Sequence, residues 1–413
     1  MTRPDAPERG SVLIARQPVF DRDLVVVAYQ LVGQATDLAD VFGELDPSTA
    51  TGRLLNDVFL EMDIETLTGG RPVLVPATTD LLLAGALDPL PPSLATIVLD
   101  AGAAADERVA AALTALRERG HRIGLGEARE GDPRLAALPV DFATVTAGPE
   151  PGKVRRDAAA VRRAGLALLL SGVDDEADFR LARSLEADEL TGAFFRTSTL
   201  VRGRRLDASR ANHLRLLALV QAEEIDFDAV EGAIKHDVAL SVKFLNYANA
   251  AFFGWRSHIE SIRHGLVLLG AQGVRHWVSL TSLARLGAGL PAEVVASAVA
   301  RARFAELLAE RTPIDVAPLD AFLSGMLSLL EAILHEPAER LLERISAGPA
   351  VRAALLEGSG ALGDLLAIVT AYEEGDLASV SERAEAHGIT SGMLFGSYLA
   401  ALTWVDEQLP ATQ

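Results

Sequence analysis

The chain has no cysteine, which excludes a disulfide framework, a thiolate zinc site and a cysteine nucleophile. It also has little positive charge: 38 basic side chains face 57 acidic ones, and the net charge is −19. A field of this sign repels phosphate, so we expect no nucleic-acid partner. The 413 residues are enough for two or three domains of ~100–200 residues each.

Long hydrophobic runs are missing as well. No apolar run reaches the ~18 residues that a membrane-spanning helix needs. The N-terminal residues Met1–Gly10 are polar and lack the apolar core of a secretion signal. We therefore expect a soluble cytoplasmic protein without a membrane partner.

Short apolar runs alternate with amphipathic segments through the first half of the chain. Most of the runs are bounded by Gly, Pro or Asp, as buried strands are. Helical spacing separates them, most clearly over Asp106–Arg119. This alternation predicts a mainly parallel sheet, and roughly six or seven units in this length favour a (β/α) barrel. The runs are Val12–Ile14, Val25–Tyr29, Val73–Val75, Ile97–Leu99, Arg122–Leu125, Phe142–Val145 and Leu166–Leu170.

The pattern changes near Leu206, after which helical spacing dominates. Prolines stand near the start of predicted helices at Pro291, Pro318 and Pro337, where the fixed φ and missing N–H cost little. We therefore predict an α/β barrel domain over residues 1–205 and an all-α domain over 206–413. The predicted junction is Arg202–Arg205.

Four carboxylates lie near the ends of predicted strands: Asp100, Glu127, Asp141 and Asp174. The first, second and fourth follow a strand, whereas Asp141 begins one. Catalytic groups of (β/α) barrels converge where the strands end, and several carboxylates there could hold Mg²⁺. The alternative is that strand ends are polar because loops begin there, and the pattern does not separate the two.

Two features of the second half have structural interpretations. The adjacent pair His236–Asp237 could ligate a metal, but no second such pair exists, and we interpret it as a polar helix end. The aromatic cluster Phe244, Tyr247, Phe252, Phe253 and Trp255 is interpreted as helix packing rather than a ligand pocket.

Two families are recognisable in the chain. Residues 15–22 (ARQPVFDR) and 27–31 (VAYQL) resemble the opening of EAL domains, which are cyclic di-GMP phosphodiesterases, and 191–195 (TGAFF) resembles their closing stretch. Residues 234–254 resemble the core of HDOD domains, with Asn249 at its central asparagine, and 259–270 and 363–376 fit the same family. The resemblance implies a bacterial EAL–HDOD signalling protein, with a degenerate EAL-type barrel followed by a helical HDOD domain.

The resemblance also indicates what the barrel has lost. The metal-binding glutamate of the EAL signature is replaced by Gln30, and the phosphate-gripping arginine by Gln34. The other site positions of the family fall near Pro76 and on Asp100, Gly126, Glu127, Thr144, Ser171 and Asp174, with Asp141 three residues before the lost lysine. A neutral amide supplies no charge for a hard cation, and a threonine cannot replace a lysine that activates water. We therefore expect no catalytic residues, metal or cofactor, and no tight cyclic di-GMP binding.

Three functional hypotheses follow. The first is a non-enzymatic signalling protein, whose HDOD domain binds partner proteins or a second copy of the chain. The second is a receptor that binds cyclic di-GMP or another nucleotide without cleaving it, with Arg16, Arg53 or Arg129 at the barrel rim. The third is an enzyme with altered chemistry that uses the four carboxylates.

Overall fold

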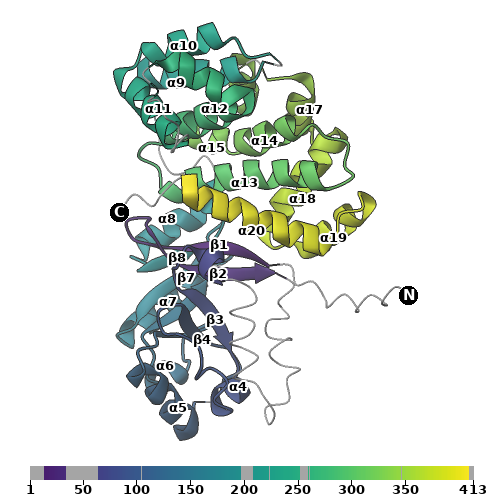
Figure 1. The fold of residues 1–413 in the computed structure, drawn as a ribbon. Coiled ribbons are helices and arrows are strands. Elements are labelled where there is room, and N and C mark those ends of the chain that lie inside the picture. Colours follow the sequence, from purple (N-terminus) through teal and green to yellow (C-terminus); the bar gives the residue numbers. More distant parts are fainter. Residues whose placement is uncertain are drawn as a thin grey trace, which may run out of the picture.

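A barrel of strands and a stack of helices make up the molecule (Figure 1). The computed structural model describes residues 14–33, 64–103, 105–196, 208–222, 224–251, 259, 261–345 and 347–408. The predicted junction Arg202–Arg205 lies outside these residues, and the division at residues 205 and 206 stays a prediction.

Eight strands close the barrel in sequence order, which confirms the predicted fold class. The first strand runs antiparallel to both of its neighbours, and all other neighbouring strands are parallel. The carboxyl ends of the parallel strands therefore meet at one rim. The strands are β1 (Ile14–Asp21), β2 (Val26–Gly33), β3 (Val73–Ala77), β4 (Ala95–Leu99), β5 (Ile123–Leu125), β6 (Phe142–Thr146), β7 (Ala167–Ser171) and β8 (Glu189–Thr191).

Short and amphipathic helices connect the parallel strands. The clearest sequence prediction is confirmed: Asp106 caps α5 by accepting hydrogen bonds from the backbone N–H groups of Arg108 and Val109, and the helix buries its apolar side. The helices are α3 (Ile64–Thr68), α4 (Thr79–Leu83), α5 (Glu107–Glu118), α6 (Arg134–Ala137), α7 (Pro151–Arg163) and α8 (Glu176–Ser184), followed by the 3₁₀ turn η1 (Phe194–Arg196).

The described residues after 207 are helical, as predicted. Gly270 has φ 68° and breaks α12 into two segments. The helices are α9 (Ala208–Val220), α10 (Phe227–Lys235), α11 (Val238–Ala251), α12 (Ile262–Leu286), α13 (Ala292–Arg311), α14 (Pro318–Leu327), α15 (Leu330–Leu334), α16 (Ala338–Arg344), α17 (Pro349–Glu357), α18 (Gly360–Glu374), α19 (Leu377–Ala386) and α20 (Ser391–Gln408).

None of the described helices is by itself both long and apolar enough to cross a membrane. Three bent helix pairs meet that test together, by length and composition only.

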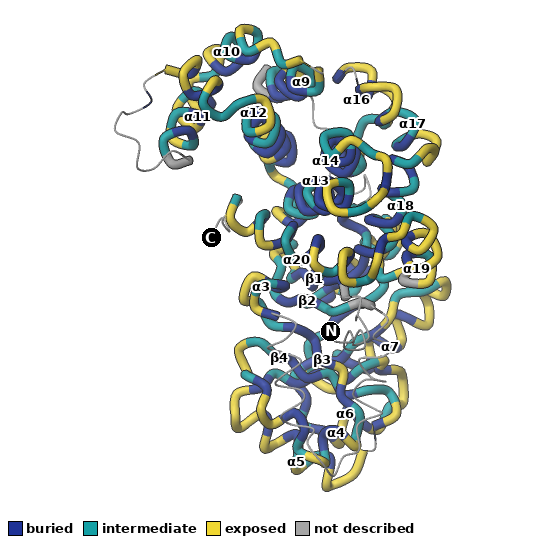
Figure 2. Tube along the Cα trace, turned by 45° about the vertical axis from the view of Figure 1, so that its right-hand side comes forward, coloured by how far each residue is buried: buried dark blue, intermediate teal, exposed yellow. Residues whose placement is uncertain are grey.

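The helices divide between two large hydrophobic cores (Figure 2). The smaller core lies among α10, α11 and the facing sides of α9 and α12, and contains Val230, Phe244 and Leu266. The larger core is continuous from the barrel through α13, α14, α18 and α20. The boundary between the two cores therefore falls inside the helical half. Helices α13–α20 pack with the barrel around the larger core.

Buried polar side chains connect the barrel to the helices above it. The Arg16 side chain lies over the Tyr29 ring, 4.5 Å from its centroid, and donates to the carbonyl oxygen of Leu67 at 2.6 Å. The Tyr29 hydroxyl donates to Glu293 of α13 at 3.3 Å. Burial raises the pKa of Glu293, and the charge of Arg16 offsets only part of this. Burial likewise raises the pKa of Tyr398, whose hydroxyl accepts from the Arg16 N–H, to about 12.

Candidate functional site

Three of the four predicted carboxylates stand at the rim where the parallel strands end. Asp100 follows β4 directly, Glu127 lies two residues after β5, and Asp174 lies three residues after β7. Asp141 precedes β6 and stands at the opposite end of the barrel. Its carboxylate accepts from the Ile123 N–H at 2.8 Å and pairs with Arg117 at 2.7 Å. Asp141 therefore anchors the start of two strands and does not join the rim set.

Asp100 is the rim carboxylate with the least favourable surroundings for its charge. Its Oδ1 is buried and has no hydrogen-bond partner among the described residues. Burial raises the pKa of this carboxyl, and the nearby Arg134 charge lowers it only in part. The backbone N–H of Gly102 also lowers the pKa of Asp100, but burial outweighs these favourable contacts.

The cation beside Asp100 is already used by another carboxylate. Arg134 at the start of α6 is buried and pairs with Asp132, with Nε–Oδ1 at 3.0 Å and Nη2–Oδ2 at 2.7 Å. A further Arg134 nitrogen donates to the carbonyl oxygen of Asp100 at 2.6 Å. Arg134 thus fixes the loops after β4 and β5. The sequence analysis missed this pair, because two oppositely charged residues in a loop carry no distinguishing spacing.

Asp132→Asn tests the strength of this pair through its pH dependence. Burial alone would raise the pKa of Asp132, but the hydrogen bonds and charge of Arg134 outweigh burial and lower it. The ionised carboxylate therefore stabilises the fold at neutral pH, and this contribution is lost only as the pH falls below the ordinary value of 3.8. We expect the variant to lose about 1.5–3 kcal/mol of unfolding free energy at pH 7.

Urea unfolding between pH 7 and pH 3 measures this difference. Glu118→Gln on the exposed side of α5 is the control, and we expect it to change stability little at any of these pH values. A wild-type advantage over Asp132→Asn that stays constant down to pH 3, or is missing at pH 7, would contradict the assignment.

The remaining predicted site residues do not assemble into an acidic cluster. Glu127 is exposed with φ 48°, and Asp174 accepts a hydrogen bond from the Ala193 N–H at 2.8 Å, which holds the segment after β8. Gln30 lies in β2 and Thr144 in β6, each half-buried. Gln34 lies outside the described residues.

The arginines proposed for a nucleotide receptor are dispersed. Arg16 is buried against the helices, Arg129 is exposed, and Arg53 lies outside the described residues. Arg129 follows β5 on the same rim loop as Glu127, so of the described pair only Arg16 departs from the rim position that the receptor hypothesis expected.

The donor set does not suit the metal ion that an EAL-type fold implies. Mg²⁺ requires several charged oxygen ligands close together. Within the described ranges, no group of three or more His, Asp or Glu side chains could hold a metal ion. Gln30 adds no charge, and Asp174 is turned to a backbone N–H. We therefore derive no metal-dependent step for the described residues.

The motif residues of the helical half have structural roles. Asp237 accepts a hydrogen bond from the Leu240 N–H at 3.0 Å at the start of α11, and His236 ends α10 with its Nδ1 2.6 Å from the carbonyl oxygen of Gly232. This confirms the polar helix end. Asn249 exchanges hydrogen bonds with the backbone of Ile259, at 3.0 Å as donor and 2.9 Å as acceptor, and so fixes where the chain returns toward α12.

The fold is a (β/α) barrel joined to a helical domain, and comparisons with known proteins identify the family to which the helical part is similar. Residues 210–346 match the HDOD domain family. The chain is 24% identical to YuxH of Bacillus subtilis, over 97% of this chain and 99% of YuxH. It is 31% identical to the cyclic di-GMP phosphodiesterase CdgJ of Vibrio cholerae, over 52% of this chain and 50% of CdgJ. Together these matches support an EAL-type barrel joined to an HDOD domain.

Solved structures of EAL domains also align with the barrel half. An EAL domain protein from Listeria monocytogenes covers 45% of this chain and 87% of its own length, with 15% identity and a TM-score of 0.35.

Proposed function

We propose that this chain is a signalling protein whose barrel does not hydrolyse cyclic di-GMP. An EAL-type barrel joined to an HDOD domain indicates cyclic di-GMP signalling. The observation that carries the loss of activity is Gln30 in β2, because a neutral amide stands where the EAL signature places a metal-binding glutamate.

The rest of the rim supports the same conclusion. Thr144 stands where the family places a water-activating lysine. Burial raises the pKa of Asp100, and the Asp174 carboxylate accepts from a backbone N–H. Catalytic groups of this kind act together. The carboxylates that remain are therefore not expected to retain a reduced phosphodiesterase activity. CdgJ is named as a phosphodiesterase. The match between CdgJ and this chain covers only about half of each, so the name of CdgJ does not establish the activity of this barrel.

A hydrolysis assay with the purified full chain tests this proposal. We expect no conversion of cyclic di-GMP above the buffer blank with Mg²⁺ or Mn²⁺, while CdgJ assayed in parallel should turn over. Detectable metal-dependent turnover that Asp100→Asn removes would overturn it. A saturable rise in melting temperature with cyclic di-GMP but no turnover would support the receptor hypothesis, because a ligand of the native state raises stability.

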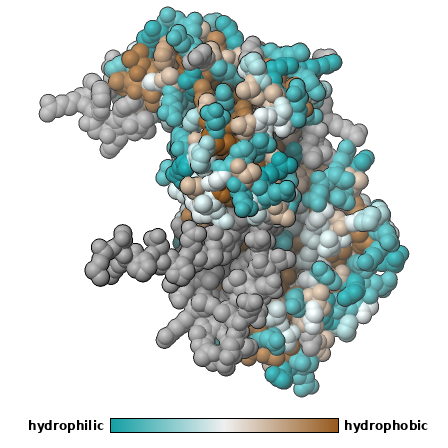
Figure 3. All heavy atoms as spheres, turned by 90° about the vertical axis from the view of Figure 1, so that its right-hand side faces the viewer, coloured by the Kyte–Doolittle hydropathy of each residue, from teal (hydrophilic) through white to brown (hydrophobic). Residues whose placement is uncertain are grey.

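The surface we propose for partner proteins lies on the helical half. Val238 and Val242 stand one turn apart on α11 and are 79% and 53% exposed, and Val267 of α12 is 60% exposed. Figure 3 shows apolar side chains gathering at the upper end of this half on one face of the molecule. Exposed apolar side chains that gather on one face are typical of protein-binding surfaces, and Val238 and Val242 are the neighbouring pair on which we base this proposal. Sedimentation of the wild-type chain and of Val242→Asp over a range of concentrations measures self-association. Self-association that Val242→Asp removes would identify a second copy of this chain as the partner, and a monomeric wild-type chain would indicate a different protein.

A further inference from the structure

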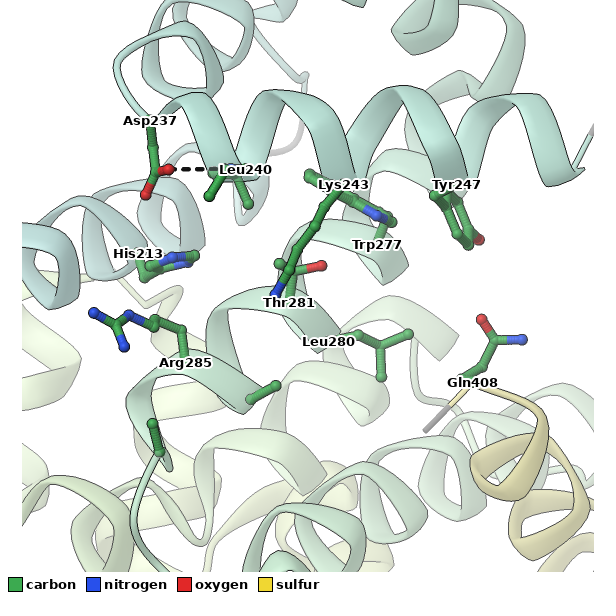
Figure 4. Close-up of a pocket in the computed structure, with 13 residues that line it drawn as sticks. His213, Asp237, Leu240, Lys243, Tyr247, Trp277, Leu280, Thr281, Arg285 and Gln408 are labelled. Atoms are coloured by element: carbon green, nitrogen blue, oxygen red, sulfur yellow. Dashed lines mark hydrogen bonds between the residues drawn. The ribbon is translucent and has the colours of Figure 1, made fainter. Parts of the chain in front are cut away.

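A pocket of about 590 Å³ lies in the helical half, away from the barrel rim. Its walls come from α9, α11, the second segment of α12 and the end of α20 (Figure 4). Leu240 and Trp277 on one side belong to the smaller hydrophobic core, and Leu280 on the other belongs to the larger one. The pocket therefore lies where two packed bodies meet, and its volume falls in the range of ~300–1,000 Å³ that small-molecule sites have.

The pocket is polar at one end and aromatic at the other. Trp277, Thr281 and Arg285 follow one another at intervals of four residues along α12. Eight residues of helix span ~12 Å, so Trp277 and Arg285 lie well apart along the pocket. In Figure 4, Tyr247 and Gln408 lie toward one end of the pocket, Lys243, Trp277 and Thr281 near the middle, and Arg285 toward the other end.

The aromatic end is fixed by packing. Trp277 is 4% exposed, and its ring lies 4.8 Å from that of Phe244 and 6.3 Å from that of Tyr247, measured between centroids. Tyr247 is half-buried and lines the pocket. Phe244 packs between helices, as we interpreted the aromatic cluster from the sequence. Tyr247 packs there too, but it also borders a cavity, which that interpretation did not include.

The polar end carries more positive than negative charge. Arg285 lines this end and Lys243 reaches the middle of the pocket, while the lining holds a single carboxylate, that of Asp237. The Asp237 carboxylate already caps α11 through the Leu240 N–H, while the structure gives Lys243 no hydrogen-bond or ion-pair partner among the described residues. In a chain with a net charge of −19, two cations beside one committed carboxylate form a locally anion-attracting site.

We propose that this pocket binds a small anion that carries a planar ring, of the size and polarity of a nucleoside monophosphate. The phosphate would lie between Lys243, Thr281 and Arg285, which supply cationic and hydroxyl donors. The ring would lie against Tyr247, Trp277 and Leu280, where an aromatic and aliphatic wall favours a flat apolar group. This site is separate from the barrel. The proposal therefore does not depend on whether the barrel binds or hydrolyses cyclic di-GMP.

Isothermal titration of the full chain with AMP, GMP, adenosine and inorganic phosphate tests the two halves of the proposed ligand. We expect AMP or GMP to bind with a saturable isotherm, at least tenfold more tightly than adenosine or phosphate alone. Phosphate or adenosine binding as tightly as both nucleotides would overturn the proposal, because one end of the pocket would then contribute nothing. The absence of binding by AMP and GMP at millimolar concentration would also overturn it.

Charge reversal locates the binding site. Lys243→Glu should weaken nucleotide binding about tenfold or more, since a charged donor to phosphate is lost and a repulsive charge is gained. The matched control is Lys235→Glu, an equal charge change on α10 at a lysine that pairs with Glu231 and does not line the pocket. Lys243→Arg should keep most of the affinity. Nucleotide binding that survives Lys243→Glu, or falls equally in Lys235→Glu, would place the ligand elsewhere and overturn the proposal.

Discussion

Gly192→Ala should lower the free energy of unfolding by about 4 kcal/mol or more, which is at the upper end of the losses caused by single substitutions. Gly192 follows β8 directly and has φ 155°. A Cβ built there would lie 2.0 Å from the carbonyl oxygen of Val173 and 2.5 Å from its nitrogen. Both are backbone atoms of the loop after β7, so no side-chain rotation relieves the overlap.

The close approach at Gly192 holds the end of β8 against the loop after β7. The Val173 N–H donates to the Thr191 carbonyl oxygen at 3.0 Å, and the Val173 carbonyl oxygen accepts from the Phe194 N–H at 3.0 Å. These two bonds lie on either side of Gly192 and turn Phe194 and Phe195 inward, where both rings lie 5.3 Å from that of Phe20. A side chain at 192 would separate the backbones and weaken the aromatic packing with them.

Thermal and urea unfolding of Gly192→Ala measure this effect against Gly165→Ala. Gly165 also has a positive φ, 75°, but a Cβ there would meet nothing within 4 Å. The control therefore carries only the backbone penalty of about 1–2 kcal/mol. If the two substitutions cost the same, the close approach to Val173 would not be the reason for the glycine. If Gly192→Ala yields no folded protein at 25 °C, the same comparison at 10 °C with a stabilising osmolyte keeps the test quantitative.

The barrel could be predicted from the sequence because its parallel strands are short, mainly apolar runs between turn residues. Ile97–Leu99 and Phe142–Val145, for example, fall within β4 and β6. The first and last strands could not be predicted well. β1 contains Arg16, Gln17 and Pro18, because part of it faces polar groups of the helices, and β8 has only three residues. Neither offers an apolar run that a periodic pattern can detect.

The candidate sites show the same limit. Gln30 and Thr144 could be identified because a family motif assigns a role to each position. The Arg134–Asp132 pair and the pocket beside Lys243 could not, because each depends on elements that meet only in three dimensions. Thr281 and Arg285 share a face of α12 by spacing, but no spacing brings them opposite Lys243 on α11. The continuous core between the barrel and α13–α20 was unforeseen for the same reason, since amphipathic spacing does not identify which partner a helix face meets.

Glu373→Ala should be the second most damaging substitution, with a loss of about 3–5 kcal/mol. Glu373 of α18 accepts two hydrogen bonds from Arg301 of α13, at 2.6 and 2.9 Å, and both side chains are about 5% exposed. Arg196 at the end of η1 approaches the same carboxylate at 3.9 Å. Removing Glu373 leaves the buried guanidinium of Arg301 near the partly buried one of Arg196. Among the described side chains, Ser328 is then the one close acceptor for Arg301.

Replacing both members of the pair separates the cost of an unpaired charge from the value of the pair itself. A buried ion pair gains Coulomb energy but loses the hydration of both ions, so an apolar replacement of similar volume is often neutral or better. We expect Arg301→Met with Glu373→Leu to recover most of the stability that either single change removes. Urea unfolding of the four chains of this cycle gives the coupling free energy, which should reach at least ~2 kcal/mol. Additive losses would contradict this expectation. They would show that the two side chains act independently and that the packing of Phe304, Tyr372 and Tyr398 holds α13, α18 and α20 together instead.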